Sequence, residues 1–361
     1  MDNKLKLAGI KDWGFKTSSP LIIAGPCSAE TEEQVMETVM ALAKQNVQMI
    51  RAGIWKPRTR PNSFEGVGFI GLQWLKKAGK EAGLPVCVEV ANAKHALDAL
   101  KLGIEALWIG ARTTVNPFAV QEIADALQGV DVPVMIKNPV NTDLELWIGA
   151  IERINKAGIT KIAAIHRGFS SYEKTKYRNK PHWEIPIELK RRIPELPLIC
   201  DPSHICGSTD YLLSVSQTAI DLNYDGLIIE SHINPKKALS DAKQQLTPEE
   251  LGELLSKIIY RRVSSDDAKF LSRLEDFRDK IDHLDETLVN MLADRMDVSR
   301  EIGKYKKEKN ITIFQPGRWD EIVRNREKQG TEKKLTVEFV RQLFEIIHQE
   351  SIHHQNKVMN S

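Results

Sequence analysis

The sequence predicts an α/β fold: a (β/α)8 barrel of the TIM type, followed by a small all-α domain that dimerises. Over roughly the first 260 residues, short apolar runs rich in Val and Ile alternate with stretches of helical period; beyond them the period is helical only. The 361 residues are also too many for one ordinary core. With 42% hydrophobic and 28% charged residues, the chain has the composition of a folded globular protein.

Eight candidate strands come first, with helical candidates between them such as 32–46, 71–83 and 116–129. The runs are apolar on both faces, and eight strand-helix units over roughly 240 residues favour a closed parallel barrel. An open doubly wound sheet is the alternative, although no glycine fingerprint between a strand and a helix supports it. In chain order the runs are LIIAGPCS (21–28), MIRAGIW (49–55), VCVEV (86–90), ALWIGA (106–111), VMIKN (134–138), IAAIHRG (162–168), LICDPSH (198–204) and GLIIES (226–231).

From about residue 266 the pattern is helical. Residues 264–310 carry apolar side chains at spacings of three and four without a proline, and two more helices are predicted at 316–330 and 336–357. So long a helix in a domain of under about 100 residues cannot bury its apolar stripe alone, and we expect a homodimer or higher homo-oligomer through this domain. The predicted limits are 1–263 for the barrel, 264–269 for a linker and 270–361 for the helical domain.

The charge and composition of the chain limit the classes of partner that it is expected to bind. A net charge of +2, from 51 basic and 49 acidic residues, is too balanced to suggest a nucleic-acid or membrane surface, and we expect neither partner. The N-terminal stretch lacks the apolar run of a signal peptide, and no segment reaches the roughly 18 apolar residues of a membrane span, so we expect a cytoplasmic protein. Four cysteines in so long a chain are not a disulfide framework.

Active sites of such barrels lie at the C-terminal ends of the strands. Barrel closure places the eighth strand beside the first, so Cys27, His204 and Glu230 share one arc, and Asp241 just past the eighth strand can reach it. A thiolate, an imidazole and two carboxylates suit a divalent Mn, Fe, Co or Zn ion. The full set of strand-end residues is Cys27, Arg51, Glu89, Arg112, Lys137, Arg167, His204 and Glu230.

The other arc of the predicted barrel is cationic. So many cations facing one pocket repel one another unless anions fill it, and arginine and lysine suit phosphate and carboxylate. A sugar-phosphate aldolase that forms a Schiff base is an open alternative, with Lys137 as its nearest candidate lysine. The cationic residues are Arg51, Lys56, Arg58, Arg112, Lys137 and Arg167.

These motifs resemble a known family over roughly residues 5–262. GPCS, IRAGIWKPRT, IGAR, KN, HRG, DPSH and IIESH followed by ALSD are similar to the metal-dependent 3-deoxy-D-arabino-heptulosonate 7-phosphate (DAHP) synthases, the β-subtype of the type I class. The KPRT motif separates them from the related 3-deoxy-D-manno-octulosonate 8-phosphate synthases. The resemblance implies condensation of phosphoenolpyruvate with erythrose 4-phosphate to DAHP and phosphate, the opening step of aromatic amino-acid biosynthesis.

The same resemblance implies roles for individual residues. The metal, on Cys27, His204, Glu230 and Asp241, would polarise the aldehyde as a Lewis acid. Erythrose 4-phosphate would lie on Pro57, Arg58 and Thr59, with Asp201 nearby. Phosphoenolpyruvate would lie across Arg51, Lys56, Arg112, Lys137 and Arg167, with Glu89 and Ala111 completing the substrate-binding set. The residues expected to act in catalysis are Lys56, Lys137, His204 and Cys27.

Residues 270–355 resemble the all-α chorismate mutases of the intertwined-dimer type. The resemblance implies a cofactor-free rearrangement of chorismate to prephenate, for which holding one conformer and stabilising charge at the ether oxygen suffice. Trp319 stands where many relatives have a Glu that binds the substrate's ring hydroxyl, and Gln315 replaces an Asp. The implied binding set is Arg278, Arg295, Lys306, Arg318, Ser351 and Gln355, with Lys306 and Gln355 as the catalytic donors to the ether oxygen.

The spacing along the long helix is compatible with this set. Arg295 and Lys306 lie on one helix face with a rise of roughly 16 Å between them, so their long side chains can converge. Arg278 lies about 100° off that face, as expected if it serves the partner's site.

Control by the pathway is a further expectation. About twenty residues precede the first strand, too few for a separate effector domain, so feedback would use the helical domain or the barrel itself. We expect prephenate or chorismate, bound in the helical domain, to be the signal. The alternative is a synthase whose helical domain is not catalytic and only senses a metabolite and dimerises.

Overall fold

The computed structural model divides the chain into two compact units, Met1–Val263 and Ser264–Ser361. The first is a closed parallel barrel and the second is helical, which confirms the predicted (β/α)8 barrel and the all-α domain that follows it. The side chains of Pro316 and Arg318 are outside the description. The residues described are 5–17, 19–56, 63–172, 175–262, 264–314 and 316–360.

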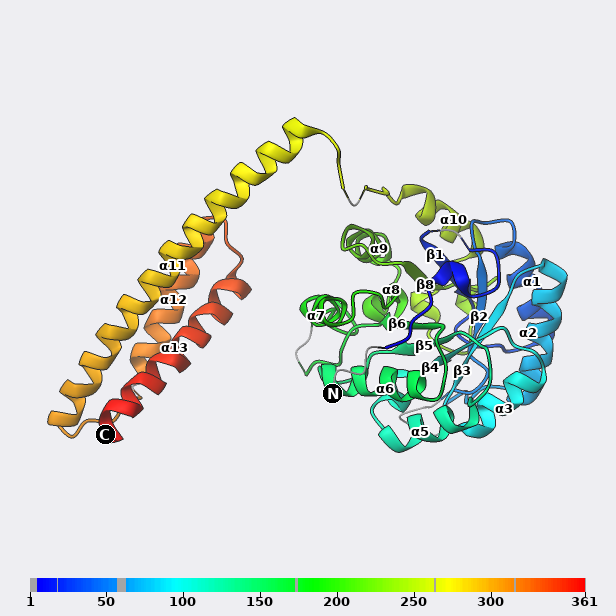
Figure 1. Cartoon of the computed structure of the whole chain (residues 1–361), viewed down its shortest axis with the longest axis horizontal. Coiled ribbons are helices and arrows are strands. Elements are labelled where there is room, and N and C mark those ends of the chain that lie inside the picture. The colour runs from blue at the N-terminus through cyan, green and yellow to red at the C-terminus, as the bar shows by residue number, and fades with distance from the viewer. Residues whose placement is uncertain are drawn as a thin grey trace. The chain divides into compact units, whose positions relative to one another are not determined.

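All eight predicted strands form, and they pair in chain order around the barrel (Figure 1). Closure is made by β1 (Leu21–Gly25) and β8 (Gly226–Glu230), which pair in parallel along their whole length. The predicted neighbourhood of the first and last strand ends is therefore correct. The other strands are β2 (Met49–Ala52), β3 (Val86–Val90), β4 (Ala106–Ile109), β5 (Val134–Lys137), β6 (Ile162–His166) and β7 (Leu198–Cys200).

Helices connect the strands, and several begin at side-chain caps. The Thr31 hydroxyl accepts a hydrogen bond from the amide of Gln34, and Thr247 forms a reciprocal capping box with Glu250. Short helices follow β4 and β7. The helices are α1 (Glu32–Leu42), α2 (Phe69–Ala82), α3 (Ala93–Lys101), α4 (Ala111–Thr114), α5 (Pro117–Ala126), α6 (Leu144–Lys156), α7 (Glu184–Arg192), α8 (Pro202–Cys206), α9 (Leu212–Asp221) and α10 (Pro248–Lys257).

The strands bury side chains in two layers. The outer layer packs against the helices, and the inner layer fills the barrel, where Trp13, Met49 and Ile228 belong to one buried cluster. Because side-chain direction along a strand repeats every two residues, Arg51 and Glu230 face the same interior as Met49 and Ile228. The barrel is thus apolar inside and charged at the C-terminal mouth of its strands.

The helical unit consists of α11 (Ala268–Glu308), α12 (Pro316–Glu332) and α13 (Val337–Asn360). All three predicted helices are confirmed, and the unit is drawn as a bundle in Figure 1. Its small core includes Met296, Val340 and Ile347. Among the described residues, no helix combines the length and the apolar character that crossing a membrane requires.

The N-terminal half of α11 is uncovered in the single chain. Large apolar side chains there are 46% to 65% exposed, which is unusual for a stripe repeated at helical spacing. They are Leu271, Phe277, Ile281, Leu284 and Leu288.

Candidate active sites

A buried ion pair lies at the mouth of the barrel. Arg51 Nη1 is 3.1 Å from Glu230 Oε1, and both side chains are almost completely buried. The side chain of Gln244 donates to the other carboxylate oxygen of Glu230 at 2.7 Å. Burial alone would raise the pKa of Glu230, but His204 and Arg51 hold it below its usual value. Glu230 is therefore an ionised carboxylate, available as a ligand.

Cys27 lies just past β1 and is fully buried. Lys56 Nζ donates to the carbonyl oxygen of Cys27 at 2.9 Å and lies 3.0 Å from its Sγ. Gly53 permits this approach, since a Cβ there would lie 2.5 Å from the Cys27 carbonyl oxygen. Burial and the charge of Glu230 raise the pKa of the Cys27 thiol to about 12, against the effect of Lys56. A metal that binds here must therefore displace a proton from the thiol.

The motif DPSH does not continue β7 as a strand. Asp201 caps α8, accepting a hydrogen bond from the amide of His204 at 3.1 Å, and Pro202 occupies the first helical position, where its missing N–H costs nothing. The apolar strand therefore ends at Cys200, directly before Asp201. The short helix turns the His204 imidazole back over the barrel mouth.

Asp201 forms ion pairs with both Lys137 and His204 at the barrel mouth. Its Oδ2 is 2.8 Å from Lys137 Nζ and 2.8 Å from His204 Nδ1. Burial alone would raise the pKa of Asp201, but His204 and Lys137 hold it well below its ordinary value. Because Nδ1 of His204 is engaged by Asp201, Nε2 is the nitrogen available to a ligand, and it lies 3.7 Å from Glu230 Oε1.

Three of the four predicted metal ligands come together at this point. Ligand atoms of Cys27, Glu230 and Asp241 lie within 4.8 Å of one another; His204 is not part of that trio. Although it lies 3.1 Å from Arg51 Nη1, Glu230 Oε1 accepts no well-oriented hydrogen bond within the described part of the chain, and it can therefore serve a ligand. Arg178 Nη1 lies 3.0 Å from Asp241 Oδ1. Partial burial would raise the pKa of the Asp241 carboxyl, but the charges of Arg178 and His204 lower it to about 2. This donor set fits a divalent transition metal.

The predicted cations surround this group. Arg51 and Lys137 are buried, and Lys56 and Arg167 are half-buried, whereas Arg112 is an exposed residue of α4. Burial lowers the pKa of Arg167 to about 10, with Arg178 and Arg112 adding to the effect and Asp201 opposing it. Burial is the main cause of this lower pKa and the neighbouring cations add to it, so an anion bound beside Arg167 would stabilise its charged form.

Other predicted substrate-binding residues lie at the same end of the barrel. Glu89 Oε2 accepts a hydrogen bond from Trp108 Nε1 at 3.0 Å at the end of β3, and Ala111 is the half-buried first residue of α4. Pro57, Arg58 and Thr59 lie outside the described residues.

Sequence reasoning missed several residues of the barrel site. The Arg51 guanidinium lies over the ring of Trp108, 5.0 Å from the ring centroid. The sequence could have revealed Trp108, because it lies two residues after Ala106 on the same strand and both side chains face the barrel interior. Gln245 accepts the amide hydrogen of Cys27 at 2.9 Å. Nothing in the local pattern distinguishes Gln245, Gln244 or Arg178 from ordinary loop residues.

The helical unit holds a separate cavity of about 450 Å³. Arg295 donates to the Ser351 hydroxyl, and Lys306 Nζ donates to the Ile313 carbonyl at 2.5 Å. The rings of Trp319 and His348 stack at a centroid distance of 4.2 Å. The residues that line the cavity are Arg295, Val298, Ser299, Ile302, Lys306, Ile313, Trp319, Ile322, His348, Ser351 and Gln355.

Four of the six residues predicted for this site thus line one cavity: Arg295, Lys306, Ser351 and Gln355. Arg278 is not among them; it is exposed on the uncovered half of α11, where it pairs with Glu275 at 3.2 Å. The side chain of Arg318 lies outside the description.

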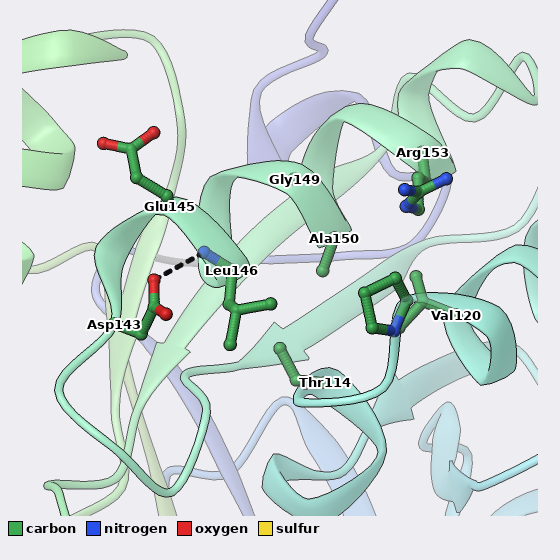
Figure 2. Close-up of a pocket in the computed structure, with 9 residues that line it drawn as sticks. Thr114, Val120, Asp143, Glu145, Leu146, Gly149, Ala150 and Arg153 are labelled. Atoms are coloured by element: carbon green, nitrogen blue, oxygen red, sulfur yellow. Dashed lines mark hydrogen bonds between the residues drawn. The ribbon is translucent and has the colours of Figure 1, made fainter.

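A further cavity of about 310 Å³ lies among α4, α5 and α6 (Figure 2). Asp143 caps α6 there by accepting the amide hydrogen of Leu146 at 3.0 Å, and the rim residues Glu145 and Arg153 bond to Arg192 and Gln121. Its charged groups already have structural partners. This cavity therefore offers no chemistry comparable to that of the barrel mouth.

Comparison with known proteins assigns both units. Residues 16–262 match the family model described as the DAHP synthetase I family. The chain belongs to this family. Residues 277–356 match the family model described as chorismate mutase type II. The predicted fusion of a DAHP synthase with a chorismate mutase is confirmed, and the chain is an enzyme with domains for both activities.

One relative and one solved structure agree with the DAHP synthase assignment, and a second, less similar relative is a different aldolase. A phospho-2-dehydro-3-deoxyheptonate aldolase of Thermotoga maritima is 36% identical over 237 residues, covering 66% of this chain and 68% of that protein. The crystal structure of a Thermotoga maritima DAHP synthase has a TM-score of 0.61 at 32% identity, covering 68% of this chain and 70% of that one. A 2-dehydro-3-deoxyphosphooctonate aldolase of Legionella pneumophila is 25% identical over 270 residues, covering 68% of this chain and 94% of that protein.

Membership has direct consequences. The two domains serve aromatic biosynthesis, and their substrates are the small molecules phosphoenolpyruvate, erythrose 4-phosphate and chorismate. DAHP synthases of this family are generally metal-dependent, and Cys27, Glu230 and Asp241 form a group able to hold a metal ion.

Proposed function

We propose that the barrel catalyses a metal-dependent, aldol-type condensation of phosphoenolpyruvate with erythrose 4-phosphate, and that the helical unit rearranges chorismate to prephenate. The observation that carries the synthase half is the convergence of Cys27, Glu230 and Asp241 beside a crowded set of cations. We assign the barrel to 1–263, the linker to 264–269 and the helical domain to 270–361. The division of the chain after Val263 supports this assignment.

In the synthase site, Cys27, His204, Glu230 and Asp241 hold a divalent Mn, Fe, Co or Zn ion. The bound ion supplies Lewis-acid polarisation of the aldehyde. Asp201 orients His204 through Nδ1 and, with Lys137, positions the sugar phosphate, whose other contacts are Pro57, Arg58 and Thr59. The phosphate and carboxylate of phosphoenolpyruvate lie against Arg51, Lys56, Arg112, Lys137 and Arg167, beside Glu89 and Ala111.

The mutase reaction needs no cofactor. Arg295 and Ser351, which already contact each other, and Arg318 bind the carboxylates of chorismate in its reactive conformer. Lys306 and Gln355 hydrogen-bond the ether oxygen, where negative charge develops in the transition state. Placement of Arg295, Lys306, Ser351 and Gln355 around one cavity supports this part of the proposal.

The helical unit functions as a homodimer. A second copy of α11 covers the apolar stripe that includes Phe277, Leu284 and Leu288, and Arg278 reaches the cavity of the partner. The support is that this half of α11 is exposed in one chain and that Arg278 does not line its own cavity. An apolar stripe of this length is stable in water only when covered.

Prephenate bound in the helical unit lowers the synthase rate. The helical cavity is cationic and accepts downstream dicarboxylates, so it is the part of the chain suited to sense the pathway's product. Such coupling requires that the ligand prefer one of two arrangements of the chain, and a typical coupling free energy of about 1–3 kcal/mol changes affinity by roughly 5- to 150-fold.

One purified sample tests both activities. Consumption of phosphoenolpyruvate with erythrose 4-phosphate, and loss of chorismate, are measured before and after chelation and on adding back single metals. We expect chelation to abolish the synthase reaction only, because the group of side chains able to hold a metal that is found among the described residues lies in the barrel. Full phosphoenolpyruvate turnover in metal-free protein would refute the metal assignment. Absence of chorismate loss would favour the alternative of a helical domain that only senses and dimerises.

Feedback is tested by titrating prephenate into the synthase assay. We expect inhibition in the full chain, weaker inhibition in the full-length Arg295→Ala variant, and none in a truncation ending at residue 263. Inhibition that persists in the truncated barrel, or none in the full chain, would reject this regulation.

A further inference from the structure

The helical cavity contains two buried polar atoms that the fold leaves unsatisfied. Gln355 Oε1 and His348 Nε2 are both buried without a hydrogen-bond partner among the described residues, and both residues line the cavity. A buried polar group without a partner is costly, so such groups usually serve a ligand. The side-chain amide of Gln355 already has a proposed role, since its Nε2 would donate to the ether oxygen, whereas His348 has none.

The remaining polar side chains of the cavity are engaged by the protein. Ser351 accepts from Arg295 and donates to the Ile347 carbonyl at 2.8 Å, and Ser299 donates to the Arg295 carbonyl at 3.1 Å. The described residues lining the cavity include no carboxylate. Apart from Gln355 and the indole N–H of Trp319, His348 is therefore the polar side chain lining this cavity that remains available to hydrogen-bond a ligand.

The environment of His348 selects a neutral ligand group. Burial, together with the positive charges of Arg295 and Lys306, lowers the pKa of His348, so the imidazole is neutral at physiological pH. A neutral imidazole can both donate and accept a hydrogen bond, which matches a hydroxyl. The stack with Trp319 at an interplanar angle of 18° fixes the plane of the ring and leaves its nitrogens at the edge.

We propose that His348 is the residue that hydrogen-bonds the ring hydroxyl of chorismate, with Trp319 as the plate that orients the imidazole. Chorismate has two carboxylates, an ether oxygen and one ring hydroxyl. The cations suit the carboxylates, and Lys306 and Gln355 suit the ether oxygen, so the hydroxyl is the group left for His348. This inference rests on the mutase activity and adds a specificity-determining residue to it.

The test is a cycle of two proteins and two substrates. The variant is His348→Phe, which keeps an aromatic ring to stack on Trp319 but cannot hydrogen-bond; the second substrate is a chorismate analogue with hydrogen in place of the ring hydroxyl. We expect the variant to lose about tenfold in kcat/KM for chorismate and less than about twofold for the analogue. His348→Gln, which can still donate and accept, should recover most of the loss.

Two controls separate this role from a structural one. His353→Phe makes the same change at an exposed position of α13 outside the cavity and should leave both substrates unaffected. The synthase rate of each variant reports only on the barrel, so the helical content and thermal unfolding of each full-length variant, measured by circular dichroism, report whether the helical unit has folded.

Equal losses of His348→Phe on both substrates would show that His348 only supports the cavity wall. No loss on chorismate would show that the hydroxyl is bound elsewhere, and either result overturns the proposal. If the wild-type protein binds chorismate without converting it, the mutase assignment fails. The role of His348 is then tested with the same proteins and ligands by comparing dissociation constants in place of kcat/KM. If the wild type does not bind chorismate, both proposals fall.

Discussion

The two sites neutralise their cations differently. In the barrel, Arg51 and Lys137 each pair with a buried carboxylate, Glu230 and Asp201. In the helical cavity, Arg295 and Lys306 contact only neutral oxygens, and no carboxylate of the described residues lines the space. The barrel thus balances these two cations with its own carboxylates. On the proposed function, the anions that balance the helical cavity would come from the dicarboxylate substrate.

The two units also differ in whether a single chain buries their apolar surfaces. The barrel closes on itself through β1 and β8, and its core is buried within the chain. The helical unit leaves the first half of α11 uncovered, and Arg278 is not among the residues that line the cavity of its own chain. A closed sheet satisfies its own edges, whereas a long amphipathic helix needs a partner surface.

The strongest test of this contrast is Cys27→Ala. It removes the one thiolate from the barrel ligand set, and we expect synthase activity to fall by at least about a thousandfold, since metal polarisation contributes several kcal/mol to the rate. Mutase activity should be unchanged. Cys87→Ala, at a buried thiol outside the ligand group, is the matched control. A Cys27→Ala enzyme with near-normal synthase activity would remove Cys27 from the metal site.

Lys306→Ala makes the reciprocal change in the helical cavity. A preorganised donor to developing charge is typically worth about 2.7–4 kcal/mol, so we expect mutase kcat to fall roughly 100- to 1000-fold. The synthase rate should largely survive, because the barrel has its own cations. Lys304→Ala, an exposed lysine on the same helix that pairs with Glu301, should leave both rates intact. Rearrangement at the wild-type rate by Lys306→Ala would place the mutase site elsewhere.

Leu284→Arg tests whether a partner completes the helical unit. Leu284 is 65% exposed in one chain, and a charge on this stripe should dissociate the dimer and lower mutase activity at least about tenfold, because Arg278 of the partner is lost. Light scattering gives the mass, and the two assays give the rates. Ala293→Arg adds the same charge to the opposite side of α11 as a control. A Leu284→Arg protein that stays dimeric would refute this interface.

Gln244→Ala has the smallest expected effect. It removes the donor that holds Glu230 Oε2 at 2.7 Å, and loss of such a contact behind a metal ligand typically weakens metal affinity by about 10- to 100-fold. Synthase activity should recover at saturating metal, and calorimetric metal titration measures the shift. If Gln244→Ala binds metal as tightly as the wild type, Glu230 is oriented without help from Gln244.

Much of the barrel site followed from local pattern. Arg51 and Glu230 extend inward-facing series that begin at Met49 and Ile228, and this alternation is a property of each strand alone. His204 was also placed on the same arc as Glu230, but the helix that carries it was not predicted, because the residues after the strand were expected to form only a turn. An N-cap followed by proline was the local signal for that helix.

By itself, the sequence determined the order of strands and helices, the charged mouth of the barrel and the unpartnered stripe of α11, because each depends on a period of two or 3.6 residues within one segment. Only the tertiary structure decided that Gln244 and Gln245 support Glu230 and Cys27, that Arg178 holds Asp241, and that His348 stacks on Trp319. These contacts join residues from different elements. No local periodicity encodes them, since they depend on where the packed core brings the chain together.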